Sequence, residues 1–172
     1  FDDRRIVAGT GTLGREIALQ SSAVGATPDA LLVPCSGGGL SAGCALALAD
    51  INAEALAPVA ASLKTHGVAV STHTVNVADK TQMAAFPDAV LAAHGAVHIV
   101  INNAGVMVAD PLETHTLEDF QCLFGINFWG VVYGCKFFLP HLRRAGEGHL
   151  VNLSSMFGFY GLPTQSSYCA SK

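Results

Sequence analysis

The C-terminal end of the chain holds a tyrosine and a lysine four positions apart, Tyr168 and Lys172. On a helix, residues at this spacing share one face. A free tyrosine has a pKa of about 10 and is a poor acid–base catalyst at neutral pH, but a neighbouring ammonium favours the phenolate. We therefore expect Tyr168 to exchange a proton with a substrate while Lys172 assists it.

Other polar residues follow the ends of expected strands. Ser155 comes just after an apolar run at 149–153, and Asn103, Ala104 and Gly105 follow another at 97–101. Ligands of open α/β sheets bind at the carboxyl ends of the strands. A hydroxyl there can hydrogen-bond a substrate carbonyl or alcohol, and small residues let the backbone approach a cofactor. Asn127 falls inside an expected helix, where its amide can hold water leading to the Lys172 ammonium.

The elements that must position these residues alternate along the chain. Strands are expected at 68–75, 97–101 and 149–153. Helices are expected from the capping residue Asp79 to about 93 with Gly95 as the stop, from 117 to 139 with Pro140 closing it, and from 167 onward. This alternation predicts a Rossmann-like α/β fold, a three-layer arrangement with helices on both faces of a parallel sheet. Four aromatic residues of the 117–139 helix are expected to be buried in the core of the protein: Phe128, Trp129, Phe137 and Phe138.

Composition narrows the classes of partner. The chain is 51% hydrophobic and 13% charged, with a net charge of −4 and no run of Lys or Arg. Nucleic acid and anionic membrane surfaces are therefore poor partners. No apolar stretch reaches the ~18 residues of a membrane span, and no metal-ligand spacing is apparent. The five cysteines form an odd set without a C-x-x-C pair, which favours reduced thiols and a cytoplasmic location.

Four motifs in order and spacing resemble the short-chain dehydrogenases/reductases. They are Asn103-Ala104-Gly105, the internal Asn127, Val151-Asn152-Leu153-Ser154-Ser155, and Tyr168-Cys169-Ala170-Ser171-Lys172. The resemblance implies an NAD(P)-dependent oxidoreductase that transfers hydride between the nicotinamide and an alcohol or carbonyl substrate. It implies that Tyr168 is the general acid/base and that Ser155 orients the substrate. Lys172 would bind the nicotinamide ribose, and Asn127 would anchor the proton relay.

The same resemblance assigns further cofactor-binding residues. Asp50 resembles the acidic residue that ends the family's second strand and takes the adenosine ribose hydroxyls. A carboxylate there repels a 2′-phosphate, so NAD is expected rather than NADP. Asn76 and Val77 stand where the family usually has Asp-Val beside the adenine, and Asn76 can offer its side-chain carbonyl to an amino group. Residues 103–105 complete the expected cofactor set.

The N-terminal segment carries different glycine motifs. Gly9, Gly11 and Gly14 follow a strand-like run at 6–8 and match the dinucleotide pattern G-x-G-x-x-G, but no acidic residue ends the next strand. Residues 1–49 better resemble fold-type II pyridoxal-phosphate enzymes, the threonine/serine dehydratases. By that resemblance a glycine-rich loop would donate backbone N–H groups to the cofactor phosphate, and the loop comprises Ser36, Gly37, Gly38, Gly39 and Leu40.

The chain is therefore expected to join two families, with 1–49 of dehydratase type and a dehydrogenase core at 50–172 that is incomplete at both ends. A second hypothesis is that residues 30–34 and 36–40 replace the missing first strand and glycine loop. It needs a strand within 44–49, where alanine and leucine favour the helix that we expect to run to Ala49. Two competing hypotheses for the function are a pyridoxal-phosphate ammonia-lyase remnant and a non-catalytic chimeric fragment. Family relatives form oligomers through the long helix and the Tyr168 helix, so a homo-oligomer is expected.

Overall fold

A five-stranded parallel sheet forms the centre of the molecule. The computed structural model describes residues 31–34, 46–65, 69–146 and 148–172. The strands lie in the order β3-β2-β1-β4-β5, which are Val70–Thr74, Leu46–Asp50, Leu31–Pro34, Ile99–Asn102 and His149–Asn152. All four pairings are parallel. The strand order reverses direction at β1 and β4, so the crevice at their carboxyl ends is where such a sheet binds ligands.

The first strand comes from the segment that precedes Asp50. β1 pairs with β2 on one side, with Leu31 opposite Leu46, and with β4 on the other, with Leu31 opposite Ile99. Among the described residues, the two strands that this replacement requires are therefore present, one before Asp50 at 31–34 and one at 46–50. The predicted motifs at 6–8, 9–14 and 36–40 lie outside the described residues.

The prediction of a helix running to Ala49 is wrong, because Leu46–Asp50 forms β2. Side chains from Leu46 to Ala49 are between 0% and 6% exposed. A strand flanked by β3 and β1 and covered on both faces buries all of its side chains, and this burial outweighs the small helix preference of alanine and leucine.

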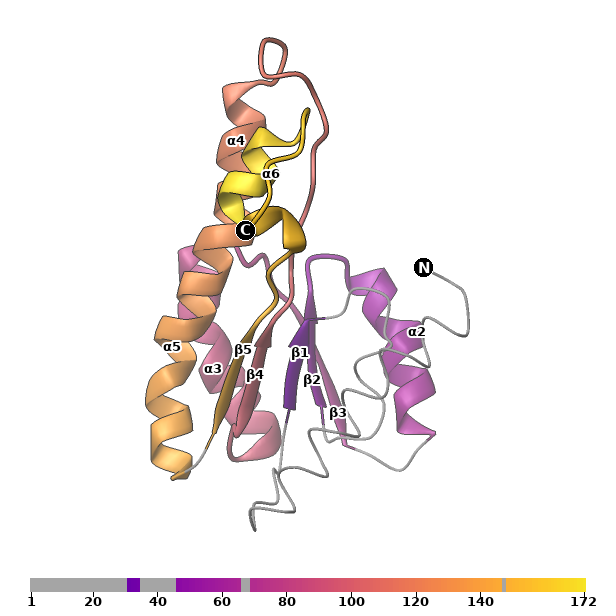
Figure 1. Ribbon diagram of the computed structural model, residues 1–172. Helices are drawn as coiled ribbons and strands as arrows, with labels where there is room; N and C mark the ends of the chain where they lie inside the picture. The colour runs from indigo at the N-terminus through magenta and orange to yellow at the C-terminus, as the bar shows by residue number, and fades with distance from the viewer. Residues whose placement is uncertain (1–30, 35–45, 66–68, 147) are drawn as a thin grey trace.

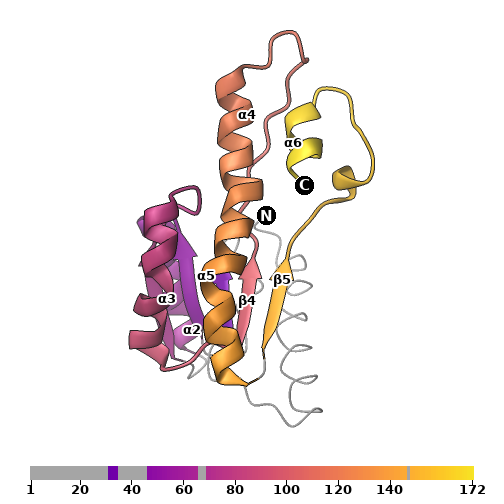
Figure 2. The ribbon, with the colours of Figure 1, turned by 90° about the vertical axis from the view of Figure 1, so that its left-hand side faces the viewer.

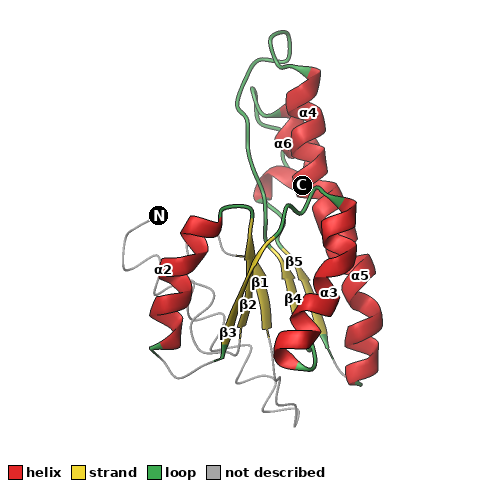
Figure 3. Ribbon diagram, turned by 180° about the vertical axis from the view of Figure 1, so that it is seen from behind, coloured by secondary structure: helices red, strands yellow, loops and turns green. Residues whose placement is uncertain are grey.

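Alternate residues of the strands pack into two separate cores. Toward one face, Leu46, Leu48, Ile99 and Ile101 pack on helix α2, Ala53–Lys64. Toward the other, small residues of β2 leave room for two aromatic rings, Phe86 of helix α3 (Lys80–His94) and Phe138 of helix α5 (Gly130–Ala145), which meet edge to face at 5.4 Å. This is the period-two pattern of a strand buried on both sides, and it yields the three layers seen in Figures 1 and 3.

The helices before residue 100 begin and end at recognisable caps. Helix α2 has no counterpart among the predicted elements; Asn52 caps it by accepting the backbone N–H groups of Glu54 and Ala55. Helix α3, Lys80–His94, follows the predicted cap Asp79 and ends at Gly95, whose φ of 79° suits glycine.

One continuous helix of 29 residues runs from Leu117 to Ala145. It comprises α4 (Leu117–Leu123), a π-helical segment η2 (Phe124–Trp129) and α5 (Gly130–Ala145), as Figure 2 shows. The predicted end at Pro140 is wrong, since this proline lies within α5. The expected core placement is wrong for Phe128 and Trp129, which are 46% and 47% exposed.

Contrary to the expectation that no apolar stretch reaches ~18 residues, an 18-residue window of this helix has a mean hydropathy of 1.4, and the helix meets the requirement for a membrane span by length and composition alone. Its glycines and Asn127 do not interrupt the helix. Instead they form its buried face toward the sheet and neighbouring loops, together with larger residues: Leu123, Asn127, Gly130, Gly134, Phe138 and Leu142.

Beyond β5 the chain forms a short 3-10 turn η3, Met156–Gly158, and then helix α6, Ser166–Ser171. Helix α6 packs against α4 and η2 beyond the carboxyl ends of the strands (Figures 1 and 2). The predicted residues of the site therefore gather at one end of the sheet.

Candidate active site at the carboxyl ends of the strands

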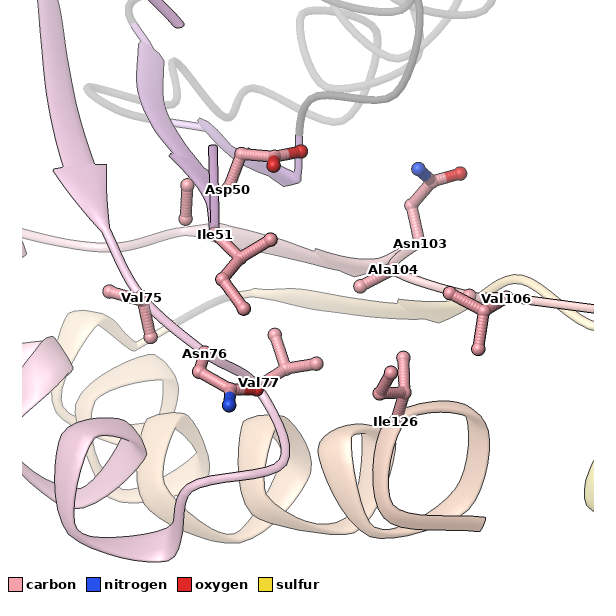
Figure 4. Close-up of a pocket in the computed structure, with 11 residues that line it drawn as sticks. Asp50, Ile51, Val75, Asn76, Val77, Asn103, Ala104, Val106 and Ile126 are labelled. Carbon is pink, nitrogen blue, oxygen red and sulfur yellow. The ribbon is translucent and has the colours of Figure 1, made fainter. Parts of the chain in front are cut away.

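A pocket of about 190 Å³ lies where β2, β3 and β4 end. Figure 4 shows its lining, which comes from the segments following three strands and from the long helix. The six cofactor residues predicted in this region all line it: Asp50, Asn76, Val77, Asn103, Ala104 and Gly105.

Asp50 ends β2 at the edge of this pocket. Its carboxylate accepts the backbone N–H of Asn52 at 2.9 Å, which fixes the turn into α2. The next residue, Ile51, is 67% exposed and points across the pocket toward Val77 (Figure 4). An exposed apolar side chain beside a carboxylate can cover a flat heterocycle while the carboxylate binds hydroxyl groups.

The turn after β3 forms another side of the pocket, through Asn76 and Val77. The side-chain carbonyl of Asn76 accepts the backbone N–H of Ala78 at 3.0 Å. This carbonyl, expected to be offered to a ligand, therefore already stabilises the turn. Val77 packs closely on the long helix, since a Cβ at Gly130 would lie 2.9 Å from its Cγ2.

Asn127 connects three segments that are far apart in the sequence. Its side-chain carbonyl accepts the N–H of Val106 at 2.8 Å, and its NH₂ group donates to Val106 O at 2.9 Å and to Ser171 Oγ at 2.8 Å. Asn127 is 3% exposed. Both of its donors are used, so the side chain holds the loop after β4 against α6 instead of binding water through those hydrogens.

Lys172 lies against the same loop. Its ammonium donates to Leu153 O at 3.2 Å and stands 6.0 Å from the centre of the Tyr168 ring. A Cβ at Gly105 would be only 2.9 Å from Lys172 Nζ and 3.3 Å from Asn127 Oδ1. Burial lowers the pKa of the Lys172 ammonium. The predicted Asn127, Gly105 and Lys172 are thus brought into direct contact.

Ser155 and Tyr168 lie on either side of η3. The Ser155 hydroxyl accepts the Phe157 N–H at 3.2 Å, which leaves its own hydrogen for donation to another group. The Phe157 ring meets the Tyr168 ring edge to face at 6.3 Å. Both Ser155 and Tyr168 are partly exposed, so a bound molecule can reach them.

Some residues of the site carried no sequence signal of their own. Ser171 bonds Asn127, and Ser154 donates to the Lys172 carbonyl at 3.0 Å. Ile51 and Ile126 complete the pocket wall. Among the described residues there is no group of three or more His, Cys, Asp or Glu side chains that could hold a metal ion.

These residues fit a nicotinamide dinucleotide. The residues that line the pocket extend from Asp50 to Val106 and include the small residues Ala104 and Gly105. The space above Gly105 has no room for a side chain because the Lys172 ammonium occupies it. The ammonium therefore lies directly against the backbone of the loop that lines the pocket, where it can hydrogen-bond a cofactor ribose.

Comparison with known proteins agrees with this arrangement. The family model for short chain dehydrogenase matches residues 37–172. SadH of Mycobacterium tuberculosis is 39% identical over 127 residues, which cover 74% of this chain and 46% of that protein. The chain thus spans about half the length of this relative.

Solved structures of the same type superpose well. A short chain dehydrogenase/reductase from Burkholderia phymatum in complex with NAD has a TM-score of 0.78 at 32% identity, covering 84% of this chain and 55% of that one. A metagenomic short-chain oxidoreductase in complex with NADP has a TM-score of 0.78 at 27% identity, covering 84% and 70%.

The comparisons correct the pyridoxal-phosphate interpretation of the N-terminal segment. The dehydrogenase match begins at residue 37 and so includes Gly37, Gly38, Gly39 and Leu40. A pyridoxal-phosphate dehydratase segment has no support, and neither does that cofactor. The physical reason is that a glycine-rich loop after a strand suits any phosphate, so the motif alone does not specify which cofactor carries it.

Proposed function

The chain belongs to the short-chain dehydrogenase family, and we propose that it binds NAD in preference to NADP and transfers hydride between the cofactor and an alcohol or carbonyl substrate. The observation that carries the proposal is the contact of Lys172 and Asn127 with the bare backbone of Gly105, next to the pocket that ends at Asp50. When bound, the nicotinamide supplies or accepts the hydride.

The remaining chemistry belongs to side chains of this chain. Tyr168 donates a proton to the carbonyl oxygen during reduction and takes it back during oxidation. The Ser155 hydroxyl donates a hydrogen bond to the same oxygen, and its position is fixed by the Phe157 N–H. The Lys172 ammonium lies 6.0 Å from the tyrosine ring centre, where it would bind the nicotinamide ribose beside the reacting groups.

Asn127 acts as a positioning residue in this proposal. It hydrogen-bonds both Val106, which follows Gly105 in the chain, and Ser171, which precedes Lys172. In this way it holds Gly105 and Lys172 close together. The proton relay from Tyr168 toward solvent depends on the Lys172 ammonium, whose place the Asn127 contacts define. Asn127 thereby anchors the relay without itself passing a proton.

The cofactor preference rests on Asp50. A carboxylate at the end of β2 hydrogen-bonds ribose hydroxyls and repels a 2′-phosphate. Asn76 and Val77 would flank the adenine, with Ile51 on the opposite side. We also propose that Ser36, Gly37, Gly38, Gly39 and Leu40, which follow β1 in the sequence, bind the cofactor diphosphate. The division of the chain at residues 49 and 50 stays a prediction.

Calorimetric titration with NADH and NADPH tests the function. We expect NADH to bind more tightly, and Asp50→Asn to reduce that preference by about tenfold, since one charge contact is worth roughly 1.4 kcal/mol. With a ketone and NADH, Tyr168→Phe and Ser155→Ala should retain NADH binding but lose most turnover. Absence of binding by either nucleotide would refute the proposal.

We propose in addition that the protein forms a homo-oligomer through the long helix. Trp129, Tyr133 and Phe137 stack along one side of it, with ring centres 5.8 and 6.0 Å apart, and Phe128 and Trp129 are nearly half exposed. Sedimentation velocity should show a dimer or larger species that Trp129→Glu dissociates; a monomeric parent protein would contradict this.

A cytoplasmic location stays a prediction; among the described cysteines, Cys122, Cys135 and Cys169 are free thiols.

A further inference from the structure

Two loops lie beyond the carboxyl ends of β4 and β5. One follows β4 from residue 106, and the other follows Ser155 and leads into α6. They are joined by the Asp110 N–H, which donates to Thr164 O at 2.8 Å. The second loop is held against α6, because Phe157 contacts the Tyr168 ring and a Cβ at Gly158 would lie 2.9 Å from the Lys172 backbone.

Large apolar side chains of these loops are exposed. Six of them are between 39% and 85% exposed: Val106, Met107, Met156, Phe159, Tyr160 and Leu162. Met156 directly follows Ser155, and the Tyr160 carbonyl accepts a hydrogen bond from the Cys169 thiol, next to Tyr168. Exposed apolar side chains close to Ser155 and Tyr168 are typical of a binding site for an apolar partner.

The segments that carry these side chains contain few charged residues. From Leu150 to Ser171 the sequence has no Asp, Glu, Lys, Arg or His, and none occurs from Ile99 to Ala109. The first charges along the loop after β4 are two carboxylates, Asp110 and Glu113. Lys172 directly follows the segment that ends at Ser171, and its ammonium donates a hydrogen bond to the Leu153 carbonyl.

From these observations we infer the substrate class, an inference that rests on the proposed function. The substrate is an uncharged alcohol or ketone that carries an aromatic or extended alkyl group beside the reacting carbon. A carboxylate or phosphate on the substrate would lose water without gaining an ion-pair partner, and two protein carboxylates would repel it. An apolar group gains from contact with Met156, Phe159 and Tyr160.

Two methyl ketones of similar length test the inference, 4-phenyl-2-butanone and 4-oxopentanoate. With NADH we expect kcat/KM for the phenyl ketone to exceed that for the carboxylate by at least about tenfold, which corresponds to roughly 1.4 kcal/mol. Met156→Lys should reduce this ratio by about tenfold, since it places a cation beside Ser155. The matched control is Leu139→Lys, an apolar residue 38% exposed on α5, and should leave the ratio unchanged.

Ligand-observed NMR of the two ketones on the same protein separates this inference from the proposed function. Preferential binding of the phenyl ketone supports the inference even if no hydride is transferred. Equal binding, preference for the carboxylate, or no binding of either ketone overturns it, while NADH binding measured in parallel judges the proposed function alone. If Phe159→Ser changes the oligomeric mass without changing the ketone preference, the surface contacts another copy and the inference is wrong.

Discussion

Replacing Gly105 with alanine should impair the site without unfolding the protein. The added Cβ would lie 2.9 Å from the Lys172 ammonium, whereas an ordinary van der Waals contact needs 3.4 to 4 Å. The ammonium must therefore move by about half an ångström or more. Because it is the far end of a flexible side chain, this movement costs little stability. The backbone φ at Gly105 is not positive, so alanine introduces no strain there.

The effect on function should be larger. A displacement of about 1 Å in an active site can cost roughly 10²-fold in rate, so half of that predicts a loss on the order of tenfold in kcat/KM. We would measure NADH affinity by calorimetry, ketone reduction by the loss of NADH absorbance, and Tm by circular dichroism. Gly161→Ala is the matched control, because its Cβ meets nothing within 4 Å.

A double-mutant cycle identifies the cause. In a Lys172→Ala background, Gly105→Ala should have much less additional effect, since the group that the Cβ displaces is gone. Equal losses in both backgrounds would show that the methyl group acts elsewhere. Wild-type affinity and rate in Gly105→Ala would refute the reasoning about the ammonium, and a large fall in Tm would refute the claim that the lysine yields easily.

Three further predictions concern stability. Asn127→Leu leaves the Val106 backbone and the Ser171 hydroxyl without their hydrogen-bond partner and should lower the free energy of unfolding by about 3 kcal/mol in urea titrations. An unchanged midpoint would contradict the inference that Asn127 holds the loop after β4 against α6. Gly134→Ala should cost about 1–3 kcal/mol by overpacking, since its Cβ would collide with the Asn102 amide, and a gain in stability would contradict this. Burial, and secondarily His94, lower the pKa of His73, so the unfolded chain binds more protons just below pH 6.5 and stability falls as pH drops through that window. His73→Gln should lose less Tm than wild type between pH 7.5 and 5.5, whereas the exposed His149→Gln should behave like wild type.

Much of the fold after residue 67 follows from local signals. Apolar runs ending in polar residues predict β3, β4 and β5, and Asp79 with Gly95 predicts both ends of α3. Strand β2 could not be predicted locally, because its alanines and leucines adopt a strand only when two helical layers and two neighbouring strands bury them. The same holds for Pro140, whose helix persists because its neighbours Phe138 and Leu142 are anchored in the core.

The residue types of the site were predictable, but their contacts were not. The family resemblance implied that Asn127 acts together with Lys172, yet the bonds of Asn127 to Val106 and Ser171 join positions 21 and 44 residues away. No periodic pattern encodes pairings over such distances. The exposure of Phe128 and Trp129 could not be predicted from the sequence either. On a helix that is apolar on several faces, the sequence pattern is the same whether an aromatic side chain faces the core or the surface.

The bond from the Val106 N–H to Asn127 has a consequence for local dynamics. Val106 lies in a loop and its side chain is 39% exposed, yet its amide hydrogen is held by a buried side chain. Hydrogen exchange at this one amide therefore requires the loop to separate from the long helix, while the sheet amides exchange only through larger openings. Its protection factor measures how often the site comes apart while the rest of the molecule remains folded.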